Sequence, residues 1–148
     1  MSMTANPVFT AYAVSATVLG FNLLVLANNT ALTRAKAKEV VNPEDTVLNA
    51  EADVVYEAGN QRTERYRRAH RNALENIPLF LITAFVLTLT GVSFTTAAVL
   101  FGIFVAARLF HSVAYVRQLQ PWRTASFAVG ALDQAAILGV LLYQVTLA

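Results

Sequence analysis

Long uninterrupted apolar segments constrain the fold of this 148-residue chain more than any other feature. An α-helix rises about 1.5 Å per residue, so about 20 mostly apolar residues are needed to cross a hydrocarbon core of roughly 30 Å. Segment 8–27 contains no charged residue, and segments 94–116 and 124–147 are mostly apolar over comparable lengths. Hydrophobic residues make up 56% of the chain and charged residues only 14%, which indicates a lipid-facing protein.

One further span is harder to recognise because only its second half is apolar. The run 77–89 is too short to cross a bilayer, so its helix must include the charged stretch 62–76 that leads into it. We therefore expect an all-α integral membrane bundle with up-down topology, forming a single four-span domain over residues 1–148. The predicted spans cover about 8–28, 62–90, 94–117 and 123–147, with a polar loop at about 29–61.

Residue types that are missing or scarce limit the possible chemistry. The chain has no cysteine, so any thiol that takes part in a reaction must come from a ligand. It has two histidines and no spacing typical of a metal site, so no metal is expected. Nothing in the charge pattern suggests a nucleic-acid partner. The first apolar segment has no preceding Lys or Arg, which favours a membrane span over a signal peptide.

The basic residues predict the orientation in the membrane. All eleven Lys and Arg fall between Arg34 and Arg123. Eight lie in the first loop and the helix entry after it, and three lie at the end of the third span and in the last loop. Four spans place these two regions on the same side, which the positive-inside rule makes the cytoplasmic side. Both termini are then expected on the opposite side.

Several charged and polar side chains fall inside the predicted spans. Helical spacing aligns Arg68, Asn72 and Glu75, with Arg71 one turn before Glu75. On the third span, one face collects Arg108, His111, Ser112 and Tyr115. A charge near the bilayer centre costs about 2.5 to 3.5 kcal/mol, so Glu75 is expected to pair with Arg108 or Arg71. A purely structural ion pair is one interpretation, but the excess of arginines favours a cradle for a small polyanion.

Two further features leave alternatives open. Asp133 lies about 15 Å past Arg123 along the last span, near the bilayer centre. An intramembrane acid can be functional, and Asp133-Gln134 can equally form hydrogen bonds between helices. In the loop, the run from Asn42 to Asp45 predicts a turn or a helix start, because Asn caps helices and Pro suits the first helical position.

Four sequence motifs resemble those of the membrane-associated proteins in eicosanoid and glutathione metabolism, the MAPEG family. The most specific motif is the run from Glu64 to Asn76, ERYRRAHRNALEN. The others, in chain order, are Asn42-Pro43-Glu44-Asp45, the run RLFHSVAY from Arg108 to Tyr115, and Pro121-Trp122-Arg123-Thr124. The pattern is most similar to the branch of microsomal prostaglandin E synthase and microsomal glutathione transferase.

The resemblance implies a homotrimer in the membrane lipid, with glutathione bound between subunits near the cytoplasmic face and a lipophilic electrophile entering from the bilayer. It implies a glutathione transferase, with peroxidase or prostaglandin-E-synthase-like isomerase activity as further possibilities. The residues implied to hold or surround glutathione are Arg34, Arg68, Arg71, Asn72, Glu75, Arg108, His111, Ser112 and Tyr115. Arg123 and Thr124 are implied to stabilise the thiolate, and Asp45 either assists proton transfer or caps the loop.

The chain departs from the prostaglandin synthase pattern at three positions. Thr124 stands in place of a serine, Phe127 in place of a tyrosine, and Asp133 where that branch has no acid. The family also contains a non-enzymatic lipid-binding scaffold of the lipoxygenase-activating type, which is the alternative function. The arginines argue against that alternative, because a lipid needs no such cradle. A channel or transporter is a weaker interpretation, since four short spans show no paired broken helices.

Overall fold

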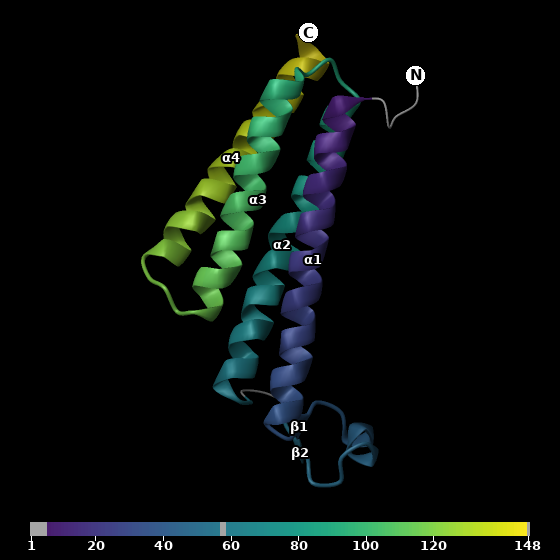
Figure 1. Ribbon diagram of the computed structural model, residues 1–148, viewed down its shortest axis with the longest axis vertical. Helices are drawn as coiled ribbons and strands as arrows, with labels where there is room; N and C mark the ends of the chain where they lie inside the picture. The colour runs from purple at the N-terminus through teal and green to yellow at the C-terminus, as the bar shows by residue number, and fades with distance from the viewer. Residues whose placement is uncertain (1–5, 57–58, 148) are drawn as a thin grey trace.

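The computed structural model describes residues 6–56 and 59–147, and these form four long helices and a small loop region. The helices are α1 (Pro7–Lys36), α2 (Gln61–Thr88), α3 (Phe94–Val116) and α4 (Trp122–Thr146). The first residues of α1 and the last residues of α4 lie at one end of the bundle, and the α1–α2 loop lies at the other (Figure 1). The expected all-α architecture with up-down topology is confirmed.

The ends of the helices follow local sequence signals. The Asn6 side chain accepts a hydrogen bond from the Val8 amide, and Pro7 occupies the first turn of α1. Asn60 caps α2 and Ser93 caps α3 in the same way. Helix α1 continues to Lys36, so residues 29–36, assigned to the loop from sequence, are helical. Polarity suggested a loop, but the side chains of Asn29 and Thr33 bond to carbonyls one turn back and the helix runs on.

Three helices, α1, α3 and α4, are long and apolar enough to cross a membrane. Helix α2 carries its charges in its N-terminal half and its apolar residues in the half that follows. The core lies where α2 meets α3: the Phe80 ring stacks on Phe104 with centroids 4.3 Å apart and meets Phe101 edge-on at 5.6 Å. This aromatic contact fixes α2 against α3 despite the polar half of α2.

The loop between α1 and α2 is more ordered than its sequence indicated. A 3-10 helix, η2 (Pro43–Val47), starts directly after Asn42, which confirms the predicted helix start. Two short strands, β1 (Glu39–Val40) and β2 (Asp53–Val54), pair in parallel, and nothing in the sequence had suggested them. They hold the loop at one end of the bundle, opposite to the start of α1 and the end of α4 (Figure 1).

Candidate functional site

The C-terminal end of α1 and the loop enclose a cavity that contains two of the predicted site residues. Arg34 and Asp45 both line this cavity of about 500 Å³, together with Lys38 and Asn49. The Asp45 carboxylate accepts a hydrogen bond of 3.3 Å from the Asn42 side chain. Asp45 therefore has a local role in the loop and also faces a cavity that is large enough for part of a small ligand.

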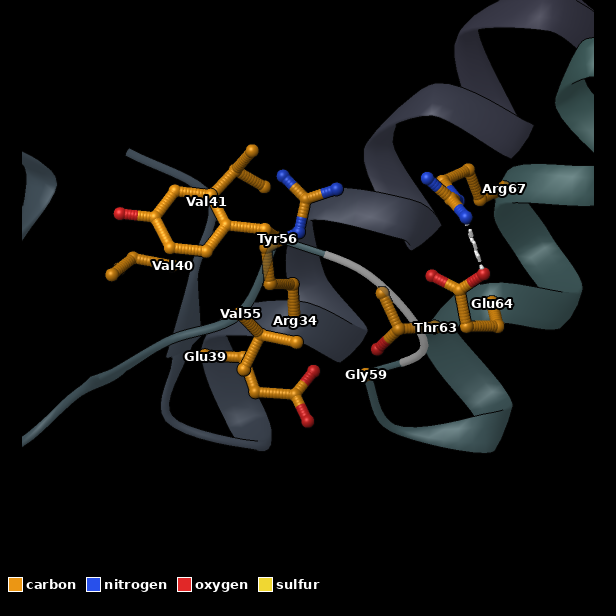
Figure 2. Close-up of a pocket in the computed structure, with 10 residues that line it drawn as sticks. All are labelled: Arg34, Glu39, Val40, Val41, Val55, Tyr56, Gly59, Thr63, Glu64 and Arg67. Carbon is orange, nitrogen blue, oxygen red and sulfur yellow. Dashed lines mark hydrogen bonds and ion pairs between the residues drawn. The ribbon is translucent and has the colours of Figure 1, made fainter. Parts of the chain in front are cut away.

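Arg34 also borders a second, smaller cavity on the side that faces α2. That space, about 40 Å³, has room for little more than water and lies between Arg34, Tyr56 and Glu64 (Figure 2). Thr63 lines it with a buried hydroxyl that has no hydrogen-bond partner among the described residues. Arg34, in the last turn of α1, thus lies between the loop and the start of α2.

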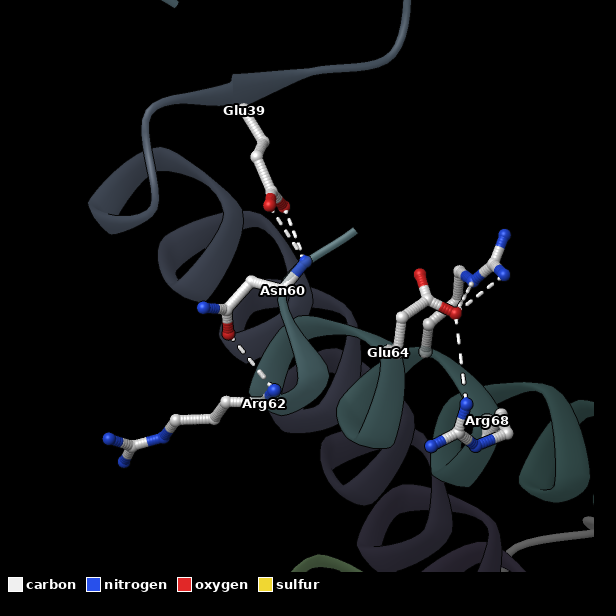
Figure 3. Close-up of polar contacts among 6 residues, drawn as sticks. Glu39, Asn60, Arg62, Glu64 and Arg68 are labelled. Carbon is white, nitrogen blue, oxygen red and sulfur yellow. Dashed lines mark hydrogen bonds and ion pairs between the residues drawn. The ribbon is translucent and has the colours of Figure 1, made fainter. Parts of the chain in front are cut away.

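A carboxylate from the loop fixes the start of α2. Both Glu39 oxygens accept from the Asn60 amide, at 2.7 and 3.0 Å, and the Asn60 side chain accepts from the Arg62 amide (Figure 3). A negative charge at a helix N-terminus is favourable, because the first amide groups point toward it. This contact fixes the loop, and with it the surroundings of Arg34, relative to α2.

The predicted residues on α2 form an exposed charged face. Arg71 Nε lies 3.8 Å from Glu75, and these two side chains are 73% and 62% exposed in the single chain. This contact confirms one of the two partners that the sequence predicted for Glu75. Arg68 lies 3.8 Å from Glu64 (Figure 3), which also binds Arg67 (Figure 2).

The amide of Asn72 belongs to the same helix but is oriented differently. Its Oδ1 is buried and has no hydrogen-bond partner among the residues described. The Asn72 carbonyl is occupied, since it accepts from the Asn76 side chain at 2.8 Å. The amide oxygen of Asn72 is therefore an unpaired acceptor inside the bundle rather than on the charged face.

A second group of predicted residues forms where α3 meets the start of α4. His111 Nδ1 lies 3.0 Å from the Arg123 carbonyl, and the Ser126 hydroxyl donates to the same carbonyl at 3.0 Å. A carbonyl only accepts, so this contact places the histidine proton on Nδ1 and leaves a lone pair on Nε2. The Arg123 guanidinium lies 4.8 Å from the centre of the Tyr115 ring.

Thr124, the other residue expected near a thiolate, is exposed on the first turn of α4. Its hydroxyl donates to Gln120 at 3.2 Å. The cap residue Pro121 provides no side-chain hydrogen bond to α4, and the Arg123 amide in the first turn donates to the Leu119 carbonyl at 2.9 Å. Arg123 and Thr124 therefore lie at a helix end whose partial charge is positive.

Two predicted residues on α3 make their contacts outside this group. Ser112 donates to the Arg108 carbonyl at 3.0 Å and accepts from the Asn22 side chain at 3.1 Å, which ties α3 to α1. Arg108 is 2% exposed, between the rings of Phe104 and Phe127, and among the described residues it forms no ion pair with Glu75. The alternative pairing of Glu75 with Arg108 is therefore wrong, because Glu75 is exposed beside Arg71 whereas Arg108 is buried between α3 and α4.

Within one chain the predicted residues thus form separate groups. One lines the cavity at the end of α1, one covers the outer face of α2, and one lies between α3 and α4. No hydrogen bond or ion pair between described residues joins the α2 group to the α3–α4 group. Sequence reasoning did not single out Ser126 or assign a role to Asn22. Ser126 lies three residues after Arg123, a spacing that places both on one side of α4.

Comparisons with known proteins agree with these motifs. The model of the MAPEG family matches residues 12–143. Human microsomal glutathione S-transferase 1 is 40% identical over 128 residues, covering 84% of this chain and 83% of the relative, and the rat protein is 37% identical with the same coverage. Human prostaglandin E synthase is 30% identical over 141 residues, covering 95% of this chain and 91% of that protein. Identity to the transferases is thus higher than to the synthase.

Proposed function

Because this chain belongs to the MAPEG family, we propose that it is a membrane-bound glutathione transferase. In this proposal it binds glutathione, ionises the thiol and transfers the thiolate to lipophilic electrophiles. The observation that carries it is the group at the start of α4, where Arg123, Tyr115 and His111 lie together beside a helix N-terminus. This arrangement suits a bound anion with a reactive sulfur.

The charges on α2 match the rest of the glutathione molecule. Glutathione carries two carboxylates and one ammonium group, so its site needs cationic donors and one acid. The exposed pair of Arg71 and Glu75 offers one of each, and Asn72 lies between them on the same helix. Arg34 and Arg68 complete the proposed surroundings, with Arg34 reaching the ligand from the end of α1.

We further propose that the site is completed between subunits of a homotrimer. An exposed ion pair on a spanning helix is costly against lipid, so another protein surface must cover Arg71 and Glu75. The group at Arg123 in a neighbouring copy supplies such a surface with the chemistry that the α2 face lacks. This explains why the two groups do not meet within one chain.

The thiolate is the reactive species in this proposal. A free thiol with a pKa near 8.5 is only a few per cent ionised at neutral pH, and a nearby cation increases that fraction. Arg123 supplies the cation, Thr124 a hydroxyl beside it, and Asp45 is the candidate for assisting proton transfer. Phe127, 41% exposed and 5.9 Å from the His111 ring, offers an apolar surface to an electrophile arriving from the bilayer. The same thiolate would serve peroxidase or isomerase chemistry.

Isothermal calorimetry of the purified protein with glutathione tests the proposal directly. We expect saturable binding, followed by conjugation of glutathione to apolar electrophiles such as aryl halides. If the protein bound fatty acids but did not bind glutathione, the scaffold alternative would be correct.

The first prediction concerns orientation. We propose that the whole chain is one membrane domain, with the α1–α2 loop and the α3–α4 turn on the cytoplasmic side. The chain has no cysteine of its own, so single cysteines can be labelled without background. Glu44→Cys in the exposed loop should react only from the cytoplasmic side. Gly91→Cys, where a Cβ meets nothing closer than 3.8 Å, should react only from the other side. Reversed labelling would contradict the proposed site location.

The second prediction concerns Glu75. We expect Glu75→Gln to weaken glutathione binding by about 1 kcal/mol, roughly fivefold, because one charge-assisted partner of the ligand is lost. Calorimetry measures the change, and size-exclusion chromatography shows whether the assembly is intact. The matched control is Glu64→Gln, which removes a carboxylate from the Arg67 and Arg68 contacts and should leave binding closer to normal. A Glu75 variant that assembles poorly, but whose assembled fraction binds glutathione normally, would support a purely structural ion pair.

A further inference from the structure

The Arg108 guanidinium is buried in the bundle without an adequate partner. The residue is 2% exposed, and its Nε and Nη1 have no hydrogen-bond partner among the described residues. Nη2 donates to the Phe127 carbonyl at 3.5 Å, which is at the limit for a hydrogen bond. The rings of Phe104 and Phe127, at 5.2 and 5.4 Å, offer cation–π contacts but no negative charge. A guanidinium with five donors still requires a counter-ion here.

Asp133 is a buried acid that also lacks a hydrogen-bond partner for one of its oxygens. It is 6% exposed, and its Oδ2 has no hydrogen-bond partner among the described residues. The sequences of α1, α3 and α4 contain no other Asp or Glu. The two acids of α2 are engaged at its charged surface, Glu64 with Arg67 and Glu75 with Arg71. Asp133 is thus the acid that the interior of the bundle offers to Arg108.

The geometry of α3 and α4 brings these two side chains toward each other. Gly130 lies against Arg108, since a Cβ there would stand 2.8 Å from the Arg108 Nε. Asp133 follows three residues later, on the same buried stripe of α4 as Gly130. Helical side chains lean toward the N-terminus of their own helix, and α3 and α4 run in opposite directions (Figure 1). The Arg108 guanidinium lies at the level of Phe127 and Gly130, and Asp133, about one turn further along α4, leans back toward Gly130.

We propose that Arg108 and Asp133 form an intramembrane charge pair, closed by a rotamer change or one bridging water, and that Asp133 is a positioning residue for the glutathione site. The pairing rests on burial and geometry alone, and the positioning role rests on the proposed function. Arg108 lies one turn before His111, whose ring contacts the Arg123 carbonyl. Long basic side chains swing toward the polar end of a span when nothing holds them. Asp133 holds the Arg108 charge away from the thiolate and neutralises it.

A double-mutant cycle tests the pair without glutathione. Breaking a buried pair leaves an uncompensated charge, whereas removing both charges does not. We expect Arg108→Gln and Asp133→Asn each to lower the melting temperature in detergent by several degrees. The double variant should melt well above the value that the sum of the two losses gives. Additive losses would overturn the pair.

The positioning role is tested by a pH titration of the thiolate absorbance of bound glutathione, whose midpoint is the pH at which half of the bound thiol is ionised. Asp133→Asn removes a negative charge and frees a cation, which favours thiolate, so the midpoint should fall by roughly 0.5 to 1 pH unit. Arg108→Gln leaves an unpaired acid and should raise it, and the double variant should return near the original value. General loosening of the site would move both single variants in the same direction, which would contradict the proposal.

Two further variants show whether a shift in the midpoint comes from the lost charge or from a loss of stability. Asp133→Glu keeps the charge and should keep the midpoint. Gln134→Leu breaks the 3.0 Å hydrogen bond from Gln134 to Thr83 without changing a charge, so it should lower the melting temperature and leave the midpoint unchanged. Coupled melting temperatures with an unmoved midpoint would keep the pair and remove the positioning role. If the original protein gave no thiolate signal, the proposed function would fail, while the melting temperatures would still decide the pair.

Discussion

Replacing Arg123 with alanine should lower turnover by roughly 10- to 100-fold while changing glutathione affinity by less than about threefold. The expected loss corresponds to a shift of one or two units in the pKa of the bound thiol, each worth about 1.4 kcal/mol. Affinity should change little, because the proposed contacts to the two carboxylates come from other arginines. Stopped-flow absorbance of the thiolate and steady-state kinetics measure the two effects separately.

Arg117→Ala is the matched control for this change. Arg117 is a basic residue that follows the last turn of α3 and is exposed, so its replacement removes the same charge near the same loop. We expect turnover close to that of the original protein. If Arg123→Ala left both the thiolate absorbance and turnover unchanged, Arg123 would have no part in the mechanism.

Gly130→Ala should destabilise the protein by about 2 to 3 kcal/mol, the upper part of the range for overpacked sites. An added Cβ would lie 2.8 Å from Arg108 Nε and 2.9 Å from Cζ, so the guanidinium must move. Because Arg108 is buried between two aromatic rings, it has little room for that movement. The melting temperature in detergent should fall, and the glutathione thiolate should respond as well, since Arg108 lies one turn from His111.

Glycines elsewhere in the same two helices provide the comparison. A Cβ at Gly139 on α4 or at Gly102 on α3 would meet nothing within 4 Å. Alanine is the better helix former by about 1 kcal/mol, so Gly139→Ala and Gly102→Ala should leave stability equal or slightly higher. A Gly130→Ala variant that behaves like these two would show that Arg108 can be displaced at no cost.

The sequence was sufficient to predict the four helices, because apolar length and caps act locally. The boundaries of α2, α3 and α4 lie within two residues of those expected. The end of α1 was wrong because polar residues after Asn29 suggested a loop, whereas their side chains bond to the helix that they extend. The paired strands β1 and β2 were not predictable, since two-residue strands have no periodicity and depend on a contact between distant segments.

The spacing of the candidate residues along each helix was predictable, but their grouping was not. Spacing on one helix correctly placed Arg71 beside Glu75, and Arg123, from the motif at the start of α4, lies against the Tyr115 ring. Spacing could not show that Ser112 faces α1, or that Arg108 lies against Gly130 rather than near Glu75. Those facts depend on the rotation of each helix about its axis, which is set by packing against its neighbours.

The division of α2 into a charged half and an apolar half also bears on how the chain enters the membrane. A segment with about 13 apolar residues is too short to partition into lipid alone. Helix α1, in contrast, is long and carries no charged residue before Arg34. We expect α1 to insert first and to carry α2 with it as a hairpin, with the arginines of α2 retained at the cytoplasmic interface. Biogenesis would then proceed by two hairpins, and the charged half of α2 would leave the aqueous interface only when subunits associate.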